Sequence, residues 1–387
     1  MILRIPDYFE DFHCLGDKCP DSCCVGWELE IDEATYGYYQ SVPGAFGDRL
    51  RASIAEAEED GEAARTFCLK VDGRCPFLDD RNLCEIVRKL GPEALPEVCT
   101  EYPRRTFCFG PYMTRSLTLS CPEVARMLLT SEPPVRFPEV DLAERVSADK
   151  EILAGENDPG ESGAADTELI AAEDGPGEDH SSDAALSPSE GEGGLEAGFV
   201  AKVRDLAIEL LEDRSLSFRE RLNRYHRFAE AVQQAIDRGE PPADPAYILY
   251  NIEETPSEIF APDRRAAFSE RLELLGELEV LTPHWEAELK ALAAMADDPP
   301  ETEFYDDVRA EHLMTYYTDR YFPLAWYDGD ILGKAEFAVF SLLTQMDMLA
   351  LRARKRGEKP AARDWIEVVS LYSKEVENLE YNTELLL

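Results

Sequence analysis

All ten cysteines of this 387-residue chain lie in its first third, between Cys14 and Cys121. Four of them, at positions 14, 19, 23 and 24, fall within eleven residues. Such crowding allows three interpretations: a disulfide framework, a thiolate site for a metal or an iron–sulfur cluster, or a set of inert buried thiols. The remaining six are Cys68, Cys75, Cys84, Cys99, Cys108 and Cys121.

A disulfide framework is the least favoured of these interpretations. A chain of this length with 44% hydrophobic residues can bury a large core and is expected to form two or three folding units. Residues 1–6 lack the pattern of a signal peptide, and the apolar stretch 335–351 contains Glu336, Gln345 and Asp347, which argues against a transmembrane segment. We therefore expect a cytoplasmic protein. In that reducing compartment, closely spaced cysteines more often bind metals than form disulfides.

The charge of the chain is strongly acidic and unevenly distributed. A formal net charge of −41 argues against nucleic acid as a partner, because phosphate binding needs clustered Lys and Arg. Residues 151–200 contain fourteen Asp and Glu, nine Gly and no Lys or Arg. Such a segment cannot bury enough apolar surface to offset the entropy of ordering it. The sequence therefore predicts a cysteine-rich domain over 1–146, an acidic disordered linker over 147–196 and a C-terminal domain over 197–387.

The sequence predicts that the C-terminal domain is helical. Apolar residues recur at helical spacing behind the capping box Ser217-x-x-Glu220, and Thr282-Pro283 opens a further helix. The expected fold class is thus mainly α: an irregular cysteine-rich metal-binding N-terminal domain followed by a helical bundle. The histidines of this half, and an aromatic cluster over 316–327, are expected to be structural.

The cysteine spacings favour a metal site without choosing the metal. Zinc ribbons usually show two Cys-x2-Cys hooks, which this chain lacks, whereas Cys14-x4-Cys19-x3-Cys23 fits an irregular iron–sulfur loop better. The chain also lacks the Cys-x3-Cys-x2-Cys signature of the radical enzymes that cleave S-adenosylmethionine. Cys68 and Cys108 stand outside the tight motifs and are expected to be ordinary buried thiols.

Three blocks of sequence resemble one known family. They are CLGDKCPDSCCVGWELEIDEATYGYY, CPFLDDRNLCEIVRKLGPEALPEVCTEYPRR and LTLSCPEVARMLL, which begin at Cys14, Cys75 and Leu117. In this order, ahead of a long helical part, they resemble the flagellin lysine-N-methylases. The first two blocks also resemble a broader group of small cysteine-rich proteins that chelate zinc or iron.

The resemblance implies S-adenosylmethionine as the methyl donor, a 4Fe–4S cluster on the cysteines with zinc as the alternative metal, and flagellin as the protein partner. Self-association is left open. The metal-binding positions that match the family are Cys14, Cys19, Cys23, Cys24, Cys75, Cys84, Cys99 and Cys121. Four thiolates suffice for one cluster, and the most specific parts of the motif hold Cys19, Cys23, Cys84 and Cys99.

Methyl transfer to lysine requires a neutral amine, although a free lysine with a pKa near ~10.4 is almost entirely protonated at pH 7. Candidate groups that take or hold this proton are Asp32, Glu101 and Tyr102, with Glu85 beside them. Each also has a plain structural interpretation as a capping or surface residue. The expected cofactor-binding residues are Arg104, Arg105 and Trp27, through a carboxylate contact for the arginines and ring stacking for the tryptophan.

Two other classes of function stay open at this level. The first is a metal-chelating protein that uses the same cysteines without catalysis, and it leaves the helical half unexplained. The second is a structural zinc domain that displays a helical interaction module. Colour separates an iron–sulfur protein from a zinc protein, because an anaerobically purified iron–sulfur protein is brown.

Overall fold

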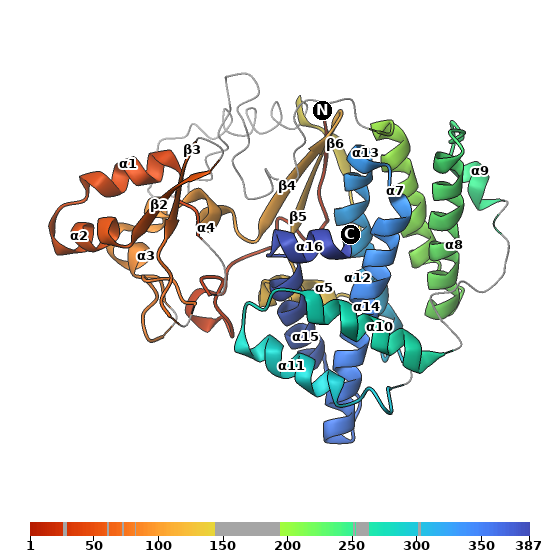
Figure 1. Cartoon of the computed structure of the whole chain (residues 1–387). Coiled ribbons are helices and arrows are strands. Elements are labelled where there is room, and N and C mark those ends of the chain that lie inside the picture. The colour runs from red at the N-terminus through yellow and green to blue at the C-terminus, as the bar shows by residue number, and fades with distance from the viewer. Residues whose placement is uncertain are drawn as a thin grey trace, which may run out of the picture.

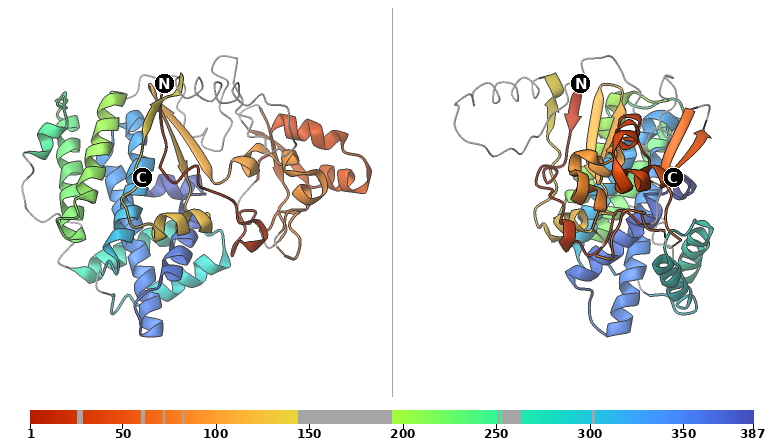
Figure 2. Two further views of the ribbon diagram at one scale, coloured as in Figure 1. Left: turned by 180° about the vertical axis from the view of Figure 1, so that it is seen from behind. Right: turned by 90° about the vertical axis from the view of Figure 1, so that its left-hand side faces the viewer.

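The computed structural model describes residues 1–25, 29–59, 62–71, 73–81, 83–143, 194–250, 252, 263–300 and 303–387 (Figure 1). A small lobe from the N-terminal part of the chain stands at one side of a larger helical part. In Figures 1 and 2 a narrow sheet lies between the two.

The small lobe combines a β-hairpin with short helices around one hydrophobic core. The hairpin is antiparallel and pairs Ile54 with Phe67. Phe67 and Phe77 meet edge to face in the core with ring centroids 5.2 Å apart, beside the buried Tyr39. The elements are α1 (Glu33–Ser41), α2 (Gly44–Ala52), β2 (Ile54–Glu59), β3 (Glu62–Phe67), α3 (Glu85–Leu90) and α4 (Glu97–Glu101).

The central sheet joins segments that are far apart in the sequence. Its order is β4 (Arg104–Phe109), β5 (Tyr112–Leu117), β1 (Ile2–Arg4) and β6 (Glu139–Asp141). β1 runs parallel to β5 and antiparallel to β6. The β4–β5 turn needs Gly110, because its φ is +54° and a Cβ there would lie 2.7 Å from the Ala197 side chain. This close approach seats the turn against the helical part.

The helical part confirms the expected mainly α fold. The predicted capping box is present, since Ser217 and Glu220 exchange hydrogen bonds between side chain and backbone. Thr282 caps the helix that follows it. The helices are α5 (Pro122–Thr130), α7 (Ala197–Glu212), α8 (Phe218–Asp237), α9 (Ala246–Leu249), α10 (Arg264–Glu277), α11 (Pro283–Ala293), α12 (Asp307–Tyr321), α13 (Ala325–Asp328), α14 (Ile331–Arg356), α15 (Ala362–Val376) and α16 (Glu380–Leu386).

Residues of the first third also belong to the larger core. α5 packs against α12 and α15, and the Arg4 guanidinium donates a hydrogen bond to Asp319 of α12 at 2.8 Å. The ring nitrogens of His312 lie 2.9 and 3.0 Å from the carbonyl oxygens of Leu128 and Pro133. The N-terminal segment, the sheet and the helices therefore share one hydrophobic core.

The acidic segment falls almost wholly outside the described residues. Of the expected linker 147–196, the described part contains 194–196 alone. The division into domains and the disorder of the linker therefore stay predictions. No helix among the described ranges combines the length and apolarity that a membrane span needs.

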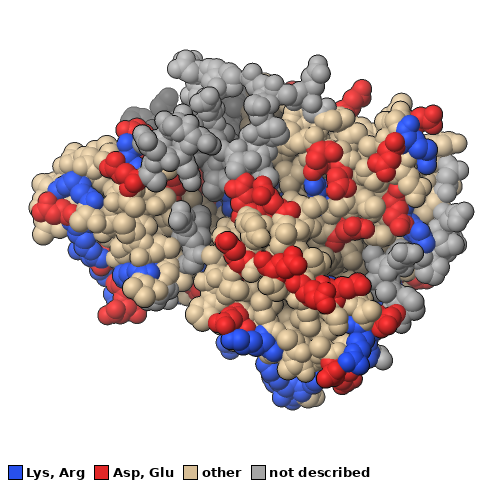
Figure 3. All heavy atoms as spheres, viewed as in Figure 1, with Lys and Arg blue, Asp and Glu red and all other residues tan. Residues whose placement is uncertain are grey.

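The charged side chains are unevenly spread over the surface. Figure 3 shows acidic groups gathered over the face that carries α10 and α16. Basic groups gather lower in the same view, where α14 ends in Arg354, Lys355 and Arg356. Cations at a helix C-terminus interact favourably with the helix dipole, so this basic end has a local structural explanation.

Candidate metal centre

The adjacent cysteines Cys23 and Cys24 occupy a turn whose two thiols lie close together. Their Sγ atoms are 3.7 Å apart. The carbonyl oxygen of Cys24 accepts a hydrogen bond from the Cys75 amide at 2.9 Å, and Val25 forms an antiparallel bridge with Arg74. The first cysteine motif is thus joined to the start of the second, backbone to backbone.

The segment from Cys75 to Cys84 forms a closed loop. Leu78 and Cys84 make an antiparallel bridge, and the Asp79 carboxylate accepts a hydrogen bond from the Leu83 amide at 3.0 Å. Cys84 stands directly before the first residue of α3. A helix N-terminus favours a negative charge, so this position suits a thiolate ligand.

Four cysteines from three segments pack against the core of the small lobe. Cys75 is buried within that core beside Phe77, and Cys24, Cys84 and Cys99 pack against it. Cys99 is contributed by α4. Four cysteine thiolates are the usual ligand set of a 4Fe–4S cluster. The fold therefore assembles, around one core, the number of thiols that such a cluster takes.

Burial keeps most of these thiols protonated in the absence of a compensating cation. It raises the pKa of Cys75 to about 11 and also raises the pKa of Cys84 and Cys99. The hydrogen bond between Cys23 and Cys24 raises the pKa of Cys24 and lowers the pKa of Cys23. A bound metal ion deprotonates a coordinating thiol outright, so a soft cation would fit this donor set.

The chemical type of these ligands suits a metal better than their arrangement in space does. Soft thiolates select zinc or iron–sulfur clusters. Tetrahedral zinc with Zn–S bonds of about 2.3 Å places its sulfurs roughly 3.8 Å apart, which the Cys23 and Cys24 sulfurs match at 3.7 Å. Across the described ranges, no three Cys, His, Asp or Glu side chains are arranged to hold a single metal ion. A metal-binding domain is thus a proposal and not a finding.

Cys23 lies beside Cys24, whereas three other expected ligands, Cys14, Cys19 and Cys121, form a second group. Cys121 is buried directly before α5, and burial raises its pKa to about 12, with further increases from the neighbouring thiols Cys19 and Cys14. The expectation that Cys68 and Cys108 are buried is wrong, because both are exposed and neither packs against the core of the small lobe. The eight predicted ligands are therefore divided between the small lobe and the start of α5.

Asp32, a candidate base, joins two helices through hydrogen bonds to its carboxylate. Its carboxylate accepts a hydrogen bond from the Thr35 amide at 2.8 Å, which caps α1, and one from the Glu97 amide at 3.0 Å, at the start of α4. Burial opposes the charge of Asp32, but these hydrogen bonds outweigh it and lower the pKa. A carboxylate with a lowered pKa is a weak base, so the geometry favours a structural role for Asp32.

Replacing Asp32 by alanine is expected to lower the free energy of unfolding at pH 7 by about 0.5–2 kcal/mol, the usual cost of losing an N-cap. Because the folded pKa lies below the unfolded value of about 3.9, this stability is present above pH 4 and is lost as pH falls through the folded pKa. Urea unfolding of the wild-type and Asp32→Ala proteins at pH 7 and pH 3 measures it. Loss of activity in Asp32→Asn with unchanged stability would instead indicate a catalytic base.

The candidates Glu101 and Tyr102 are adjacent but differ in environment. Glu101 is exposed and pairs with Arg115 at 3.3 Å. Tyr102 packs against the larger core, and its hydroxyl lies 3.1 Å from the Ser120 hydroxyl. Burial raises the pKa of Tyr102 well above its ordinary value, and the neighbouring Cys121 thiol adds to the increase. Tyr102 therefore keeps its proton at neutral pH and can donate a hydrogen bond.

The expected cofactor-binding residues do not form one group. Arg104 and Arg105 are consecutive in β4, and consecutive side chains of a strand point to opposite faces. The pair therefore does not converge on a single carboxylate, and their assignment stays a prediction. Trp27 lies outside the described residues. Glu85, the other carboxylate near the motifs, is held by Arg49 at 3.1 Å.

Two contacts made by α15 could not be predicted from the sequence. Lys374 donates hydrogen bonds to the Asp21 carboxylate and the Ser22 carbonyl oxygen, at 2.5 and 3.1 Å. The Ser373 hydroxyl lies 3.5 Å from that of Thr118. The C-terminal end of α15 thus touches both the first cysteine loop and the chain next to Ser120.

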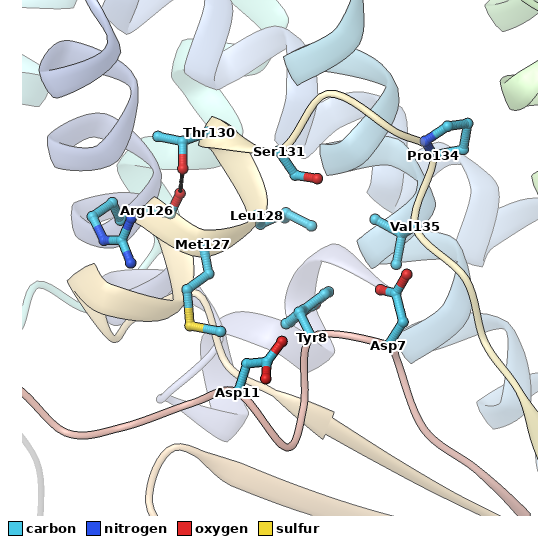
Figure 4. Close-up of a pocket in the computed structure, with 10 residues that line it drawn as sticks. All are labelled: Asp7, Tyr8, Asp11, Arg126, Met127, Leu128, Thr130, Ser131, Pro134 and Val135. Atoms are coloured by element: carbon cyan, nitrogen blue, oxygen red, sulfur yellow. Dashed lines mark hydrogen bonds between the residues drawn. The ribbon is translucent and has the colours of Figure 1, made fainter.

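A partly open cavity of about 260 Å³ lies at the C-terminal end of α5 (Figure 4). Asp7, Tyr8 and Asp11 of the N-terminal segment line one side, and Met127 of α5 faces them. Arg126 on its rim is bound to Glu123 by two hydrogen bonds. None of the residues that line this cavity is one of the predicted site residues, so it is a feature separate from the cysteine centre.

Comparison with known proteins finds relatives among flagellar proteins and methylases. No protein-family model matches the chain, and no solved structure matches it. The flagellar biosynthetic protein FliU of Salmonella muenchen is 31% identical over 129 residues, which cover 32% of this chain and 75% of that protein. Lysine-N-methylases of Salmonella choleraesuis and Salmonella typhimurium are each 28% identical over 145 residues.

The matches differ in how much of each relative they cover. The two lysine-N-methylase matches cover 36% of this chain, and the chain spans about a third of each relative, 35% of its length. The FliU match instead covers three-quarters of that protein at more than 30% identity. The chain belongs to the family of the flagellar biosynthetic protein FliU.

Proposed function

We propose that the chain is a lysine N-methyltransferase that modifies flagellin with S-adenosylmethionine as methyl donor and holds an iron–sulfur cluster on its cysteines. The relatives named lysine-N-methylase support methyl transfer, and FliU supports a link to the flagellum. Because the methylases are matched over about a third of their length, their activity is a proposal for this chain. The observation that carries it is the packing of four thiols around one core.

The proposed ligands of the cluster are Cys24, Cys75, Cys84 and Cys99. They share the core of the small lobe, and the Cys24–Cys75 backbone hydrogen bond holds two of them together. When bound there, a cluster would supply an electron-accepting centre and a rigid link between the three segments that carry its ligands. The choice of Cys24 and Cys75 differs from the motif-based emphasis on Cys19 and Cys23, and it rests on packing.

S-adenosylmethionine would supply a methyl group carried on a sulfonium centre. The chain itself must remove the proton of the acceptor ammonium and keep water away. Glu101 has an exposed carboxylate able to accept that proton. Tyr102 beside it keeps its own proton, because burial raises its pKa, and is suited to orient a neighbouring polar group. We therefore assign proton acceptance to Glu101 and positioning to Tyr102.

The test is anaerobic purification followed by iron and sulfide analysis and incubation with labelled S-adenosylmethionine and flagellin. We expect brown protein, iron and sulfide in about equal amounts, as in a 4Fe–4S cluster, and label on flagellin lysines. Flagellin whose lysines have been acetylated is the matched control, because its amines cannot accept a methyl group. The rate is expected to rise with pH as more acceptor lysine becomes neutral.

Two outcomes would favour the other classes of function. Colourless protein that contains zinc and transfers no label would support a structural zinc domain with a helical interaction module. Protein that binds iron but neither binds S-adenosylmethionine nor labels flagellin would support a metal-chelating protein. Either outcome would overturn the methyltransferase proposal.

A further inference from the structure

Lys374 connects the helical part to the first cysteine loop across 353 positions of sequence. Its ammonium lies 2.5 Å from the Asp21 carboxylate and donates a second hydrogen bond to the Ser22 carbonyl oxygen at 3.1 Å. The Lys374 side chain is 6% exposed, whereas that of Asp21 is 47% exposed. The lysine is thus buried at the boundary between α15 and the loop.

A buried ammonium is costly unless it is paired and hydrogen-bonded. The acidic residues that follow Lys374 at the C-terminal end of α15 accept hydrogen bonds from other groups. Glu375 accepts hydrogen bonds from the Leu281 amide and the Thr282 hydroxyl, and Glu377 accepts one from Tyr316. The Asp21 carboxylate and the Ser22 carbonyl are therefore the groups to which Lys374 donates its hydrogen bonds.

The contact continues through the loop to a proposed ligand. The Asp21 carboxylate also accepts a hydrogen bond from the Ser22 amide at 2.7 Å, and the Ser22 hydroxyl accepts one from the Cys24 amide at 3.3 Å. On its other side Cys24 is held by the Cys75 amide. The backbone of Cys24 is thus tied to Lys374 on one side and to the second cysteine motif on the other.

The same turn of α15 also reaches the neighbourhood of Tyr102. A chain of hydroxyl contacts runs from Ser373 to Thr118 at 3.5 Å, from Thr118 to Ser120 at 3.2 Å, and from Ser120 to Tyr102 at 3.1 Å. One end of one helix therefore contacts the loop that carries Cys24 and the segment that carries Tyr102. The two regions keep a fixed relation to each other through α15.

We infer that Lys374 is a positioning residue: it holds the loop 21–24 in place for metal binding and provides a positive charge beside the thiolate centre. The inference rests on the proposed function, because it concerns the same cysteine site. In this inference the helical part helps to position the cysteine loop, a role that a protein that only chelates metal does not need. A cation near a cluster favours its reduced, more negative form, so the charge acts on the reduction potential as well as on the geometry.

The experiment compares Lys374→Met, Lys374→Arg and the wild-type protein. Lys334→Met is the matched control, because Lys334 is a 4% exposed lysine paired with Asp328 at 2.6 Å within the helical part. We measure iron per chain, the midpoint potential of the cluster, and amide exchange of residues 19–25 in the metal-free protein.

Lys374→Met is expected to weaken iron retention by roughly 10- to 100-fold, to shift the midpoint potential to a more negative value and to speed amide exchange in the loop. Lys374→Arg should recover the potential, and Lys334→Met should match the wild type in all three.

Failure of the inference can be told apart from failure of the proposed function. If Lys374→Met keeps wild-type iron, potential and loop exchange, the inference is overturned and the proposed function stands. If Lys374→Arg is no better than Lys374→Met, the charge has no role and the inference is equally overturned. If the wild-type protein binds no iron, the proposed function fails, and exchange in the metal-free loop still decides whether Lys374 positions it.

Discussion

Replacing Cys75 by serine is expected to remove most of the iron from the anaerobically purified protein and to abolish methyl transfer with it. Cys75 is 4% exposed and its amide is bonded to the carbonyl of Cys24, so a replacement ligand cannot easily enter. A serine hydroxyl is a harder and far less acidic donor than a thiol and is a poor ligand for an iron–sulfur cluster. Iron and sulfide per chain, with the visible absorption of the cluster, measure the loss.

Two further serine variants make this experiment decisive. Cys68→Ser is the control, since Cys68 is exposed and packs against neither core, and it should keep its iron. Cys19→Ser separates two interpretations of the site: the motif includes Cys19 among the ligands, whereas in the fold its thiol acts on the pKa of Cys121 at the start of α5. We expect Cys19→Ser to keep its iron. Equal iron in Cys75→Ser and Cys68→Ser would disprove the proposed ligand set.

Replacing Glu311 by alanine is expected to lower the free energy of unfolding by about 3–5 kcal/mol, the cost of breaking a buried ion pair. Glu311 of α12 is fully buried and accepts hydrogen bonds from Arg214 at 2.7 Å and from Arg221 at 2.5 Å. Arg221 is itself 2% exposed, so the variant leaves a buried guanidinium without its carboxylate. Urea unfolding followed by circular dichroism measures the change.

The control for this prediction is an exposed ion pair of the same kind. Glu367 of α15 pairs with Arg363, and their side chains are 46% and 87% exposed. Glu367→Ala is therefore expected to cost less than about 1 kcal/mol. Glu311→Gln keeps an acceptor without the charge and should fall between the two, which gives a result even if Glu311→Ala does not fold. Equal stability of Glu311→Ala and Glu367→Ala would show that the buried pair contributes nothing.

The helices and their ends could be predicted because their signals are local. The Ser217 capping box lies three residues from Glu220, and the apolar stripe behind it is one face of α8. Neither signal depends on what the helix later packs against. The mainly α class followed from repeated signals of this kind along residues 197–387.

The central sheet could not be predicted, because its pairing is short and non-local. β1 has three residues, and Ile2 pairs with Tyr112 on one side and with Asp141 on the other. A three-residue strand is too short to show an alternating pattern. The pairing partners, more than a hundred residues away, are set by the packing of the whole N-terminal segment.

The cysteine motifs predicted a thiol centre but could not say which thiols share it. Spacing along the chain relates Cys19 to Cys23, and Cys75 to Cys84. The fold instead packs Cys24 with Cys75, Cys84 and Cys99 against one core, and Cys19 lies near Cys121. Which sulfurs meet depends on how three segments close around the core of the small lobe, and spacing carries no information about that closure.

The sequence by itself determined which stripe of α15 is apolar, since Trp365, Val368 and Tyr372 recur at helical spacing. Lys374 lies about 200° around the helix from Tyr372, on the face that this pattern assigns to solvent. Only the tertiary structure decided that this face is buried as well, because the loop of Asp21 covers it and supplies the compensating charge. Periodicity reports where a helix is apolar. It cannot report that a polar face is buried, because that depends on a partner supplied by a distant part of the chain.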